Sequence, residues 1–183
     1  SALFRDEPTV DSLGMMGLEV TAVGNHEFDR GTAELLRMQK GGCHPGDGCK
    51  GPQPFKGASF KYLAASTIDT RSGQTILPAY HVKHFEGIPV AFIGLTLKDT
   101  PNIVVPSGVA GLRFDDEATT VNRLVPELKR QGIEAIVVTA SGCGVQVKEY
   151  GHVLADDAVY AEKAAKISAL CRDPSEVLAG ERE

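Results

Sequence analysis

The sequence lacks the features typical of membrane-spanning and nucleic-acid-binding chains. None of its apolar runs approaches the roughly 20 residues needed to span a bilayer. No block of Lys or Arg stands out and the formal net charge is −5, which argues against a binding surface for nucleic acid or anionic lipid. Repeats and low-complexity segments are also absent. What remains, 183 residues of which 42% are hydrophobic and 23% charged, is typical of one globular domain with a sizeable core.

An initiating Met is absent, and no charged and then apolar signal segment opens the chain. We therefore expect residues 1–183 to be an interior piece of a longer polypeptide. On that interpretation, the missing signal segment carries no information about the compartment.

Cysteines are few, and two of the four, Cys43 and Cys49, bracket the short loop "CHPGDGC". One interpretation is a disulfide, and another is a metal site with His44 as a third ligand. Structural zinc sites usually place two to four residues between paired cysteines, whereas this loop has five. The spacing therefore favours a disulfide and an oxidising compartment, with free surface cysteines as a third alternative. Cys143 and Cys171 are too far apart in sequence for a pairing to be predicted.

Strand and helix patterns alternate along the chain, which predicts an α/β fold with a mixed sheet. Leu13, Met16 and Leu18 fall on one short helical face. A hairpin is expected with its turn at Glu86 and Gly87. We expect loops at residues 41–57 and 99–112. The expected strands are 19–23, 61–67, 80–85, 88–96 and 134–139, and the expected helices are 31–40, 116–131 (capped by residue 115 or 116) and 157–170.

A cluster of polar side chains follows the first strand, in "VTAVGNHEFDRG". Ligands commonly bind where core strands of α/β folds end. Asn25 offers a neutral oxygen that suits Mn, Mg or Zn, and His26 offers a general acid or transition-state donor. Asp29 can hold one imidazole nitrogen of His26 and fix its tautomer. The alternative interpretation is that Asn25 and Asp29 cap the next helix while His26 packs.

The string "GNHEFD" resembles a signature block of the calcineurin-like metallophosphoesterases, and within them of the bacterial 5′-nucleotidase family. Its context, including "LGMMGLEVTAVGNHEFDRGTAELLRM" and "LPAYHVKHFEGIPVAFIGLTLKDTPNIV", is similar in order to that family from Leu3 to about Thr139. The resemblance implies an incomplete four-layer sandwich, with mixed β-sheets flanked by helices. It assigns residues 1–139 to part of the catalytic domain, and 140–183 to the end of that domain or to an interdomain linker.

The resemblance also implies the chemistry of a metal-dependent phosphoric monoester hydrolase. Asn25 would ligate one of two divalent metals (Mn, Zn, Mg or Ca), His26 would be the catalytic histidine that carries no metal, and Asp29 would orient it. Two such metals clamp the oxygens of an in-line displacement and generate hydroxide. The implied substrate is a nucleotide or another phosphate ester, hydrolysed in the periplasm or outside the cell.

The sequence departs from the family pattern at several metal-ligand blocks. No Asp-x-His or Gly-Asp block precedes the "GNHEFD" block, and no Gly-His-x-His pair follows it. The segment "YGHVLA" has His152 but no second histidine. His81 and His84 fall on the expected hairpin. One amide cannot hold two metals, so we expect no competent hydrolase from this chain alone. Either it is a join of segments from a longer enzyme, or it is a fragment that is inactive or serves as a non-catalytic binding module.

Overall fold

The computed structural model describes residues 2–51, 53–133, 135–139, 152, 155–156 and 159–170. The chain divides into two compact units, Ser1–Thr139 and Ala140–Glu183. In the described part of the second unit, α6 covers Ala161–Leu170. None of the helices among the described residues combines the length and the apolar character that crossing a membrane requires.

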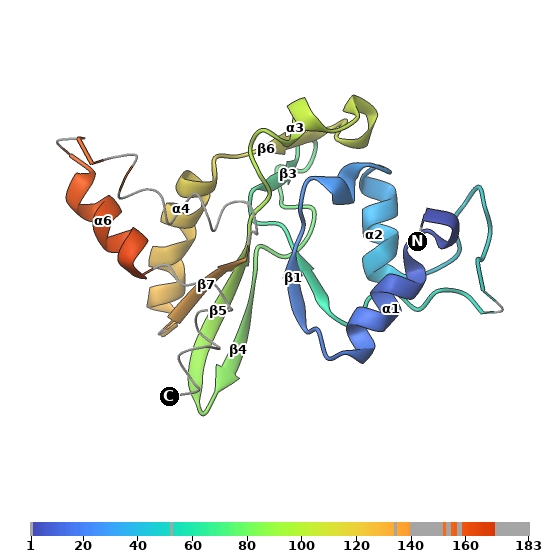
Figure 1. Cartoon of the computed structure of the whole chain (residues 1–183), viewed down its shortest axis with the longest axis horizontal. Coiled ribbons are helices and arrows are strands. Elements are labelled where there is room, and N and C mark those ends of the chain that lie inside the picture. Colours follow the sequence, from blue (N-terminus) through green and yellow to red (C-terminus); the bar gives the residue numbers. More distant parts are fainter. Residues whose placement is uncertain are drawn as a thin grey trace. The chain divides into compact units, whose positions relative to one another are not determined.

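The first unit is built on short strands that pair in three groups (Figure 1). Strand β1 runs parallel to β2, β5 lies between β4 (antiparallel) and β7 (parallel), and β3 pairs with β6 in the antiparallel sense. The strands are β1 Val20–Ala22, β2 Lys61–Leu63, β3 Thr67–Asp69, β4 Tyr80–Phe85, β5 Ile88–Gly94, β6 Leu112–Phe114 and β7 Ala135–Thr139.

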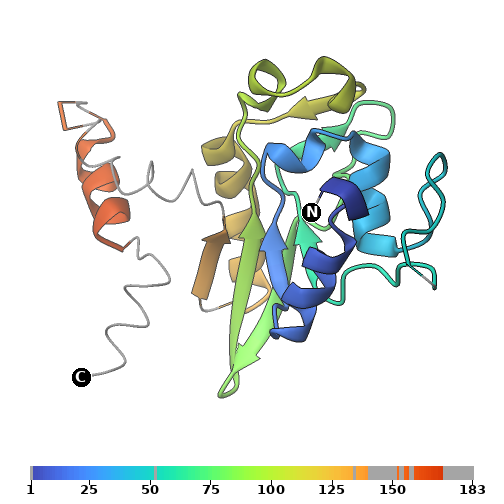
Figure 2. The same cartoon turned by 45° about the vertical axis from the view of Figure 1, so that its right-hand side comes forward.

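Helices flank these strands. Figures 1 and 2 show α1 and α2 beside the β1–β2 pair, and α4 beside β5 and β7. The α-helices of the first unit are α1 Glu7–Met15, α2 Thr32–Lys40, α3 Thr100–Ile103 and α4 Glu117–Arg130, and the 3-10 helices are η1 Ala2–Phe4, η2 His26–Phe28 and η3 Pro106–Gly108. The predicted class, mixed β-sheets flanked by helices, is confirmed.

The core that supports the candidate site lies between α1, α2 and the β1–β2 pair. Burial of apolar side chains supplies the main stabilisation of such a unit. Val23, which precedes the polar cluster, and Phe28, which lies within it, are fully buried members of this core. The buried cluster comprises Val10, Val23, Phe28, Leu35, Met38, Phe55, Phe60, Tyr62, Ala64, Leu77, Val109 and Phe114.

Local sequence signals predicted the longer elements correctly. Helix 31–40 forms as α2, and helix 116–131 forms as α4, whose cap is Asp116: its side chain accepts a hydrogen bond from the Thr119 N–H at 2.9 Å. The hairpin forms with Glu86 and Gly87 both at positive φ, 50° and 89°, as its two-residue turn requires.

Other expectations were wrong. Residues 61–67 do not form one strand: β2 ends at Leu63, because the next amides bond elsewhere, Ala64 to the Pro78 carbonyl and Ala65 to the Gly94 carbonyl. Met16 is 80% exposed and follows α1 rather than packing on a helical face. The segment 99–112 is not wholly loop, since α3, η3 and the start of β6 lie in it.

Candidate active site

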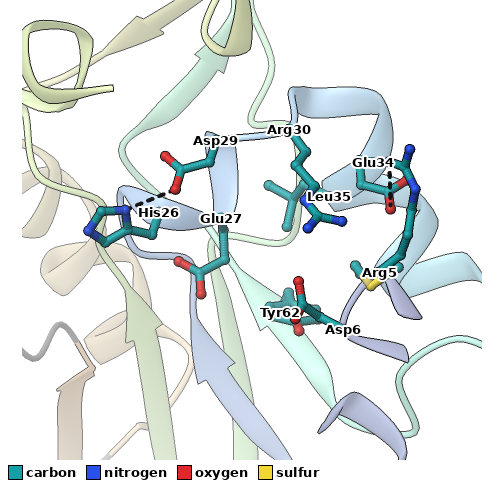
Figure 3. A pocket seen from close by; sticks show the side chains of 10 residues that line it. Arg5, Asp6, His26, Glu27, Asp29, Arg30, Glu34, Leu35 and Tyr62 are labelled. Carbon is teal, nitrogen blue, oxygen red and sulfur yellow. Dashed lines mark hydrogen bonds and ion pairs between the residues drawn. The ribbon is translucent and has the colours of Figure 1, made fainter. Parts of the chain in front are cut away.

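The polar cluster lies where β1 ends. After the buried Val23 the chain passes through Gly24 and Asn25 into η2, a single turn that carries His26 at its start and Asp29 directly after it. The imidazole Nδ1 of His26 lies 3.0 Å from a carboxylate oxygen of Asp29 (Figure 3). The two side chains are 80% and 49% exposed, so the pair faces solvent.

Buried contacts on the core side of this turn hold it in place. The Phe28 side chain is fully buried and meets the Phe114 ring edge-on, with 5.3 Å between ring centroids. At Gly108, a Cβ atom would lie 2.1 Å from the Phe28 carbonyl oxygen, so a residue without a side chain is required there. The exposed pair is therefore mounted on a well-packed turn.

The capping interpretation of the cluster is wrong. Asn25 makes no side-chain cap, and α2 begins after Gly31 rather than after Asp29. His26 does not pack, since it is largely exposed. In the tautomer whose Nδ1–H donates to Asp29, Nε2 of His26 is the ring nitrogen that makes no contact with that carboxylate.

A pocket of about 220 Å³ adjoins the pair (Figure 3). Burial, together with the negative charges of Glu27 and Asp6, raises the pKa of Tyr62 to about 12. The Tyr62 hydroxyl therefore keeps its proton throughout the neutral pH range. The pocket is lined by Arg5, Asp6, His26, Glu27, Asp29, Arg30, Glu34, Leu35, Met38 and Tyr62.

One wall of the pocket includes Glu34, which belongs to a buried ion group with Glu7 and Arg37. Arg37 donates two hydrogen bonds to Glu34, at 2.8 and 2.9 Å, and one to Glu7 at 2.7 Å. The side chains are at most 10% exposed. Hydrogen bonds from Arg37 hold the pKa of Glu34 below its ordinary value, and bonding to Glu34 raises the pKa of Arg37.

The cysteine loop packs against the same wall. Cys43 and Cys49 are joined as a disulfide, and Nδ1 of His44 accepts hydrogen bonds from the backbone of Gly46 and Asp47. The metal interpretation of this loop is therefore wrong, because its sulfurs are bonded to each other. Asp47 forms an ion pair with Arg5 at 2.6 Å, which links the loop to the pocket.

The residues that the sequence singled out do not form a metal centre by themselves. Asn25 is half-buried beside His26 and brings a single amide oxygen. Across the described residues, no group of three or more His, Cys, Asp or Glu side chains is placed to hold a metal ion. His81 and His84 lie on β4, away from the pocket lining. Cys143 and Cys171 lie outside the described residues.

Several residues of the pocket and of the ion group beside it were missed from sequence. Arg5 and Tyr62 gave no signal, because they are far from the "GNHEFD" block and joined to it only by the fold. Arg37 offered one: it falls on the inward face of helix 31–40, between Leu35 and Met38. A buried cation on an apolar face requires buried anions, and Glu7 and Glu34 provide them.

The chain is similar in sequence to curated proteins of two names. It is 44% identical over 140 residues to "Endonuclease YhcR" of Bacillus subtilis, which covers 76% of this chain and 11% of that protein. It is 29% identical over 138 residues to "5′-nucleotidase" of Vibrio cholerae, with 75% of this chain and 22% of that protein covered. The chain thus spans less than a quarter of either relative. No protein-family model matches it.

Solved structures give the same answer for the fold. A 5′-nucleotidase precursor from Thermus thermophilus is 28% identical with a TM-score of 0.58, over 74% of this chain and 24% of that one. The calcineurin-like phosphoesterase YfkN from Bacillus subtilis is 20% identical with a TM-score of 0.55. That match covers 74% of this chain and 40% of the YfkN chain. The fold is therefore that of the calcineurin-like metallophosphoesterases. Within that class, the part of the chain that these comparisons cover resembles a portion of the 5′-nucleotidases.

One further match is to a different kind of protein. The chain is 57% identical over 47 residues to the "Glycolate oxidase iron-sulfur subunit" of Escherichia coli. This match covers 26% of the chain and 12% of that protein. The phosphoesterase matches leave about a quarter of the chain uncovered. The chain therefore has relatives of two kinds.

Proposed function

We propose that the first unit supplies the His26–Asp29 part of the active site of a metal-dependent phosphomonoesterase of 5′-nucleotidase type. The observation that carries this proposal is the 3.0 Å contact between His26 Nδ1 and Asp29 at the end of β1. Support comes from the 5′-nucleotidase relative and solved structure. The proposed substrate class is a nucleoside monophosphate or a similar phosphate ester.

In this proposal each side chain has a defined task. Asp29 accepts from the Nδ1–H of His26, so that in the protonated imidazolium the Nε2–H is directed to the reacting ester, where it stabilises the transition state or gives its proton to the leaving oxygen. Asn25 would offer its amide oxygen to one of two divalent ions (Mn, Zn, Mg or Ca), and the described residues contain no group of three or more His, Cys, Asp or Glu side chains that could complete such a site. When bound, such ions supply the hydroxide nucleophile and stabilise the developing charge.

The test is His26→Ala in the full-length protein, with phosphate release from AMP as the readout. Removal of a positioned proton donor is expected to lower kcat by about 10²–10⁴. His84→Ala on the exposed end of β4 is the matched control and should leave kcat unchanged. Unchanged phosphate release from His26→Ala would show that the assigned role is wrong.

We also propose that the enzyme works in an oxidising, exported setting, because Cys43 and Cys49 are paired beside the pocket. Alkylation of the native protein without reductant checks this. We expect neither cysteine to be labelled; labelling of both in protein isolated from its own host would contradict the proposal.

For residues 140–183 we propose a unit that is separate from the catalytic domain. The support is the division of the chain at Thr139 and the 47-residue match to a protein of another kind, which has about the length of this unit. Residues 1–139 expressed alone should then unfold at the same temperature as the first unit in the whole chain. A large drop in that temperature would show instead that residues 140–183 complete the catalytic domain.

A further inference from the structure

Buried hydroxyl groups gather directly behind the His26 turn. Ser66 and Thr96 are 0% and 1% exposed. They lie a few residues past the ends of β2 and β5, as Val23 lies past the end of β1. Buried hydroxyls are costly unless they are hydrogen-bonded, so the bonds that they make indicate what holds these strand ends together.

The Thr96 hydroxyl bonds to the last buried peptide before the site. Its Oγ1 donates to the carbonyl oxygen of Val23 at 2.8 Å, and the Val23 N–H donates to the Leu63 carbonyl at 3.0 Å. Val23 is therefore held on both sides, by the β2 backbone and by one side chain from beyond β5. Gly24, Asn25 and His26 follow it without any intervening element.

Ser66 fixes Thr96 in turn. The Thr96 N–H donates to Ser66 Oγ at 2.9 Å, and Ser66 Oγ–H donates to the Thr96 carbonyl at 2.9 Å. The serine hydroxyl thus acts as donor and acceptor toward the same residue. Because side-chain networks of this kind are fully satisfied and shielded from water, they specify one arrangement of the backbone.

We propose that Thr96, oriented by Ser66, is a positioning residue that sets the place of Asn25 and His26 relative to the ends of β2 and β5. Its catalytic consequence rests on the function proposed above, but its structural consequence does not. Thr96 touches the Val23 carbonyl and not the reacting groups, so it acts through the backbone. Displacements of about 1 Å at a catalytic group are enough to cost up to 10²-fold in rate.

The test compares Thr96→Val, which keeps the shape and removes the hydroxyl, with Thr96→Ser, which keeps the hydroxyl. Thr120→Val is the matched control, because Thr120 is also buried and its hydroxyl donates to a backbone carbonyl, that of Asp116 on α4. In the full-length protein we expect Thr96→Val to lower kcat about tenfold with KM changed less than about threefold. Thr96→Ser should retain kcat within about threefold, and Thr120→Val should match wild type.

A second readout does not depend on activity. In NMR spectra of residues 1–183, Thr96→Val should shift the amide signals of Asn25 and the ring signals of His26, Thr96→Ser should restore them, and Thr120→Val should leave them in place. Ser66→Ala should shift the same signals if Thr96→Val does not fold. Signals and kcat that respond to Thr96→Val no more than to Thr120→Val would overturn the proposal. If the wild-type enzyme cleaves no phosphate ester, the proposed function fails, whereas the NMR comparison still decides the role of Thr96.

Discussion

Two acid–base groups, each with at least one residue in the lining of the same pocket, have similar hydrogen-bond lengths but opposite surroundings. Glu34 and Arg37 are joined at 2.8 and 2.9 Å with side chains at most 9% exposed. His26 and Asp29 are joined at 3.0 Å with side chains 80% and 49% exposed. We expect burial, rather than bond length, to separate a group that stabilises the fold from one that is accessible to a reactant.

The physical reason lies in solvation. A buried ion group has given up the hydration of every charge, so loss of one member leaves the others unpaired in a medium of low dielectric. An exposed pair keeps most of its water, and its charges are screened. The first group should therefore govern stability and the second should govern reactivity.

The largest expected effect is on the buried group. Arg37→Met keeps much of the side-chain volume but leaves Glu7 and Glu34 without their shared cation. We expect the free energy of unfolding to fall by about 3–5 kcal/mol. Arg113→Met is the matched control, because Arg113 pairs with Asp115 at 2.6 Å on the exposed surface, where a much smaller loss is expected. Urea titration of both variants measures the difference.

Acid unfolding sharpens this result. The pKa of Glu34 is lowered in the folded protein by its hydrogen bonds with Arg37, so its contribution to stability is complete above the ordinary glutamate pKa of about 4.3. It is lost as the pH falls through the lowered pKa. The free energy of unfolding should therefore decrease less on acidification below about pH 4 in Arg37→Met than in the wild type. Equal stability losses in Arg37→Met and Arg113→Met would contradict the distinction between the two groups.

Sequence predicted the elements whose causes are local. The turn at Glu86 and Gly87, the Asp116 cap and the glycine after α2 act within a few residues, so each could be inferred from neighbouring letters. The split between β2 and β3 could not, because it depends on Ala64 and Ala65 bonding to distant carbonyls. Tertiary hydrogen bonds override strand propensity in such places.

In the candidate site too, contacts between residues close in sequence could be predicted, whereas contacts between distant residues could not. His26 and Asp29 are three residues apart, and the orienting contact expected from that spacing is present at 3.0 Å. Arg5 and Thr96 are far from them in sequence, and they reach the site only because α1, β2 and β5 pack around β1. Their roles could be inferred only from the three-dimensional structure, since no spacing rule links them to the "GNHEFD" block.

The smallest effect on stability is expected at the exposed pair, and it completes the comparison. Asp29→Asn keeps the size of the side chain while removing the charge that holds the His26 Nδ1–H. We expect the free energy of unfolding to change by less than about 0.5 kcal/mol, since exposed pairs contribute little. In the full-length protein kcat should nevertheless fall by about 10–100-fold, as is typical when an orienting partner is removed.

Asp115→Asn is the control for that variant, because Asp115 also pairs with a cation on the surface, and it should alter neither quantity appreciably. Thermal unfolding and AMP hydrolysis, measured on the same preparations, separate the two roles. A loss of stability in Asp29→Asn as large as that in Arg37→Met would mean that the His26 turn depends on its surface pair rather than on the buried Phe28. Unchanged stability with reduced kcat would place the folding role in the buried group and the chemical role in the exposed pair.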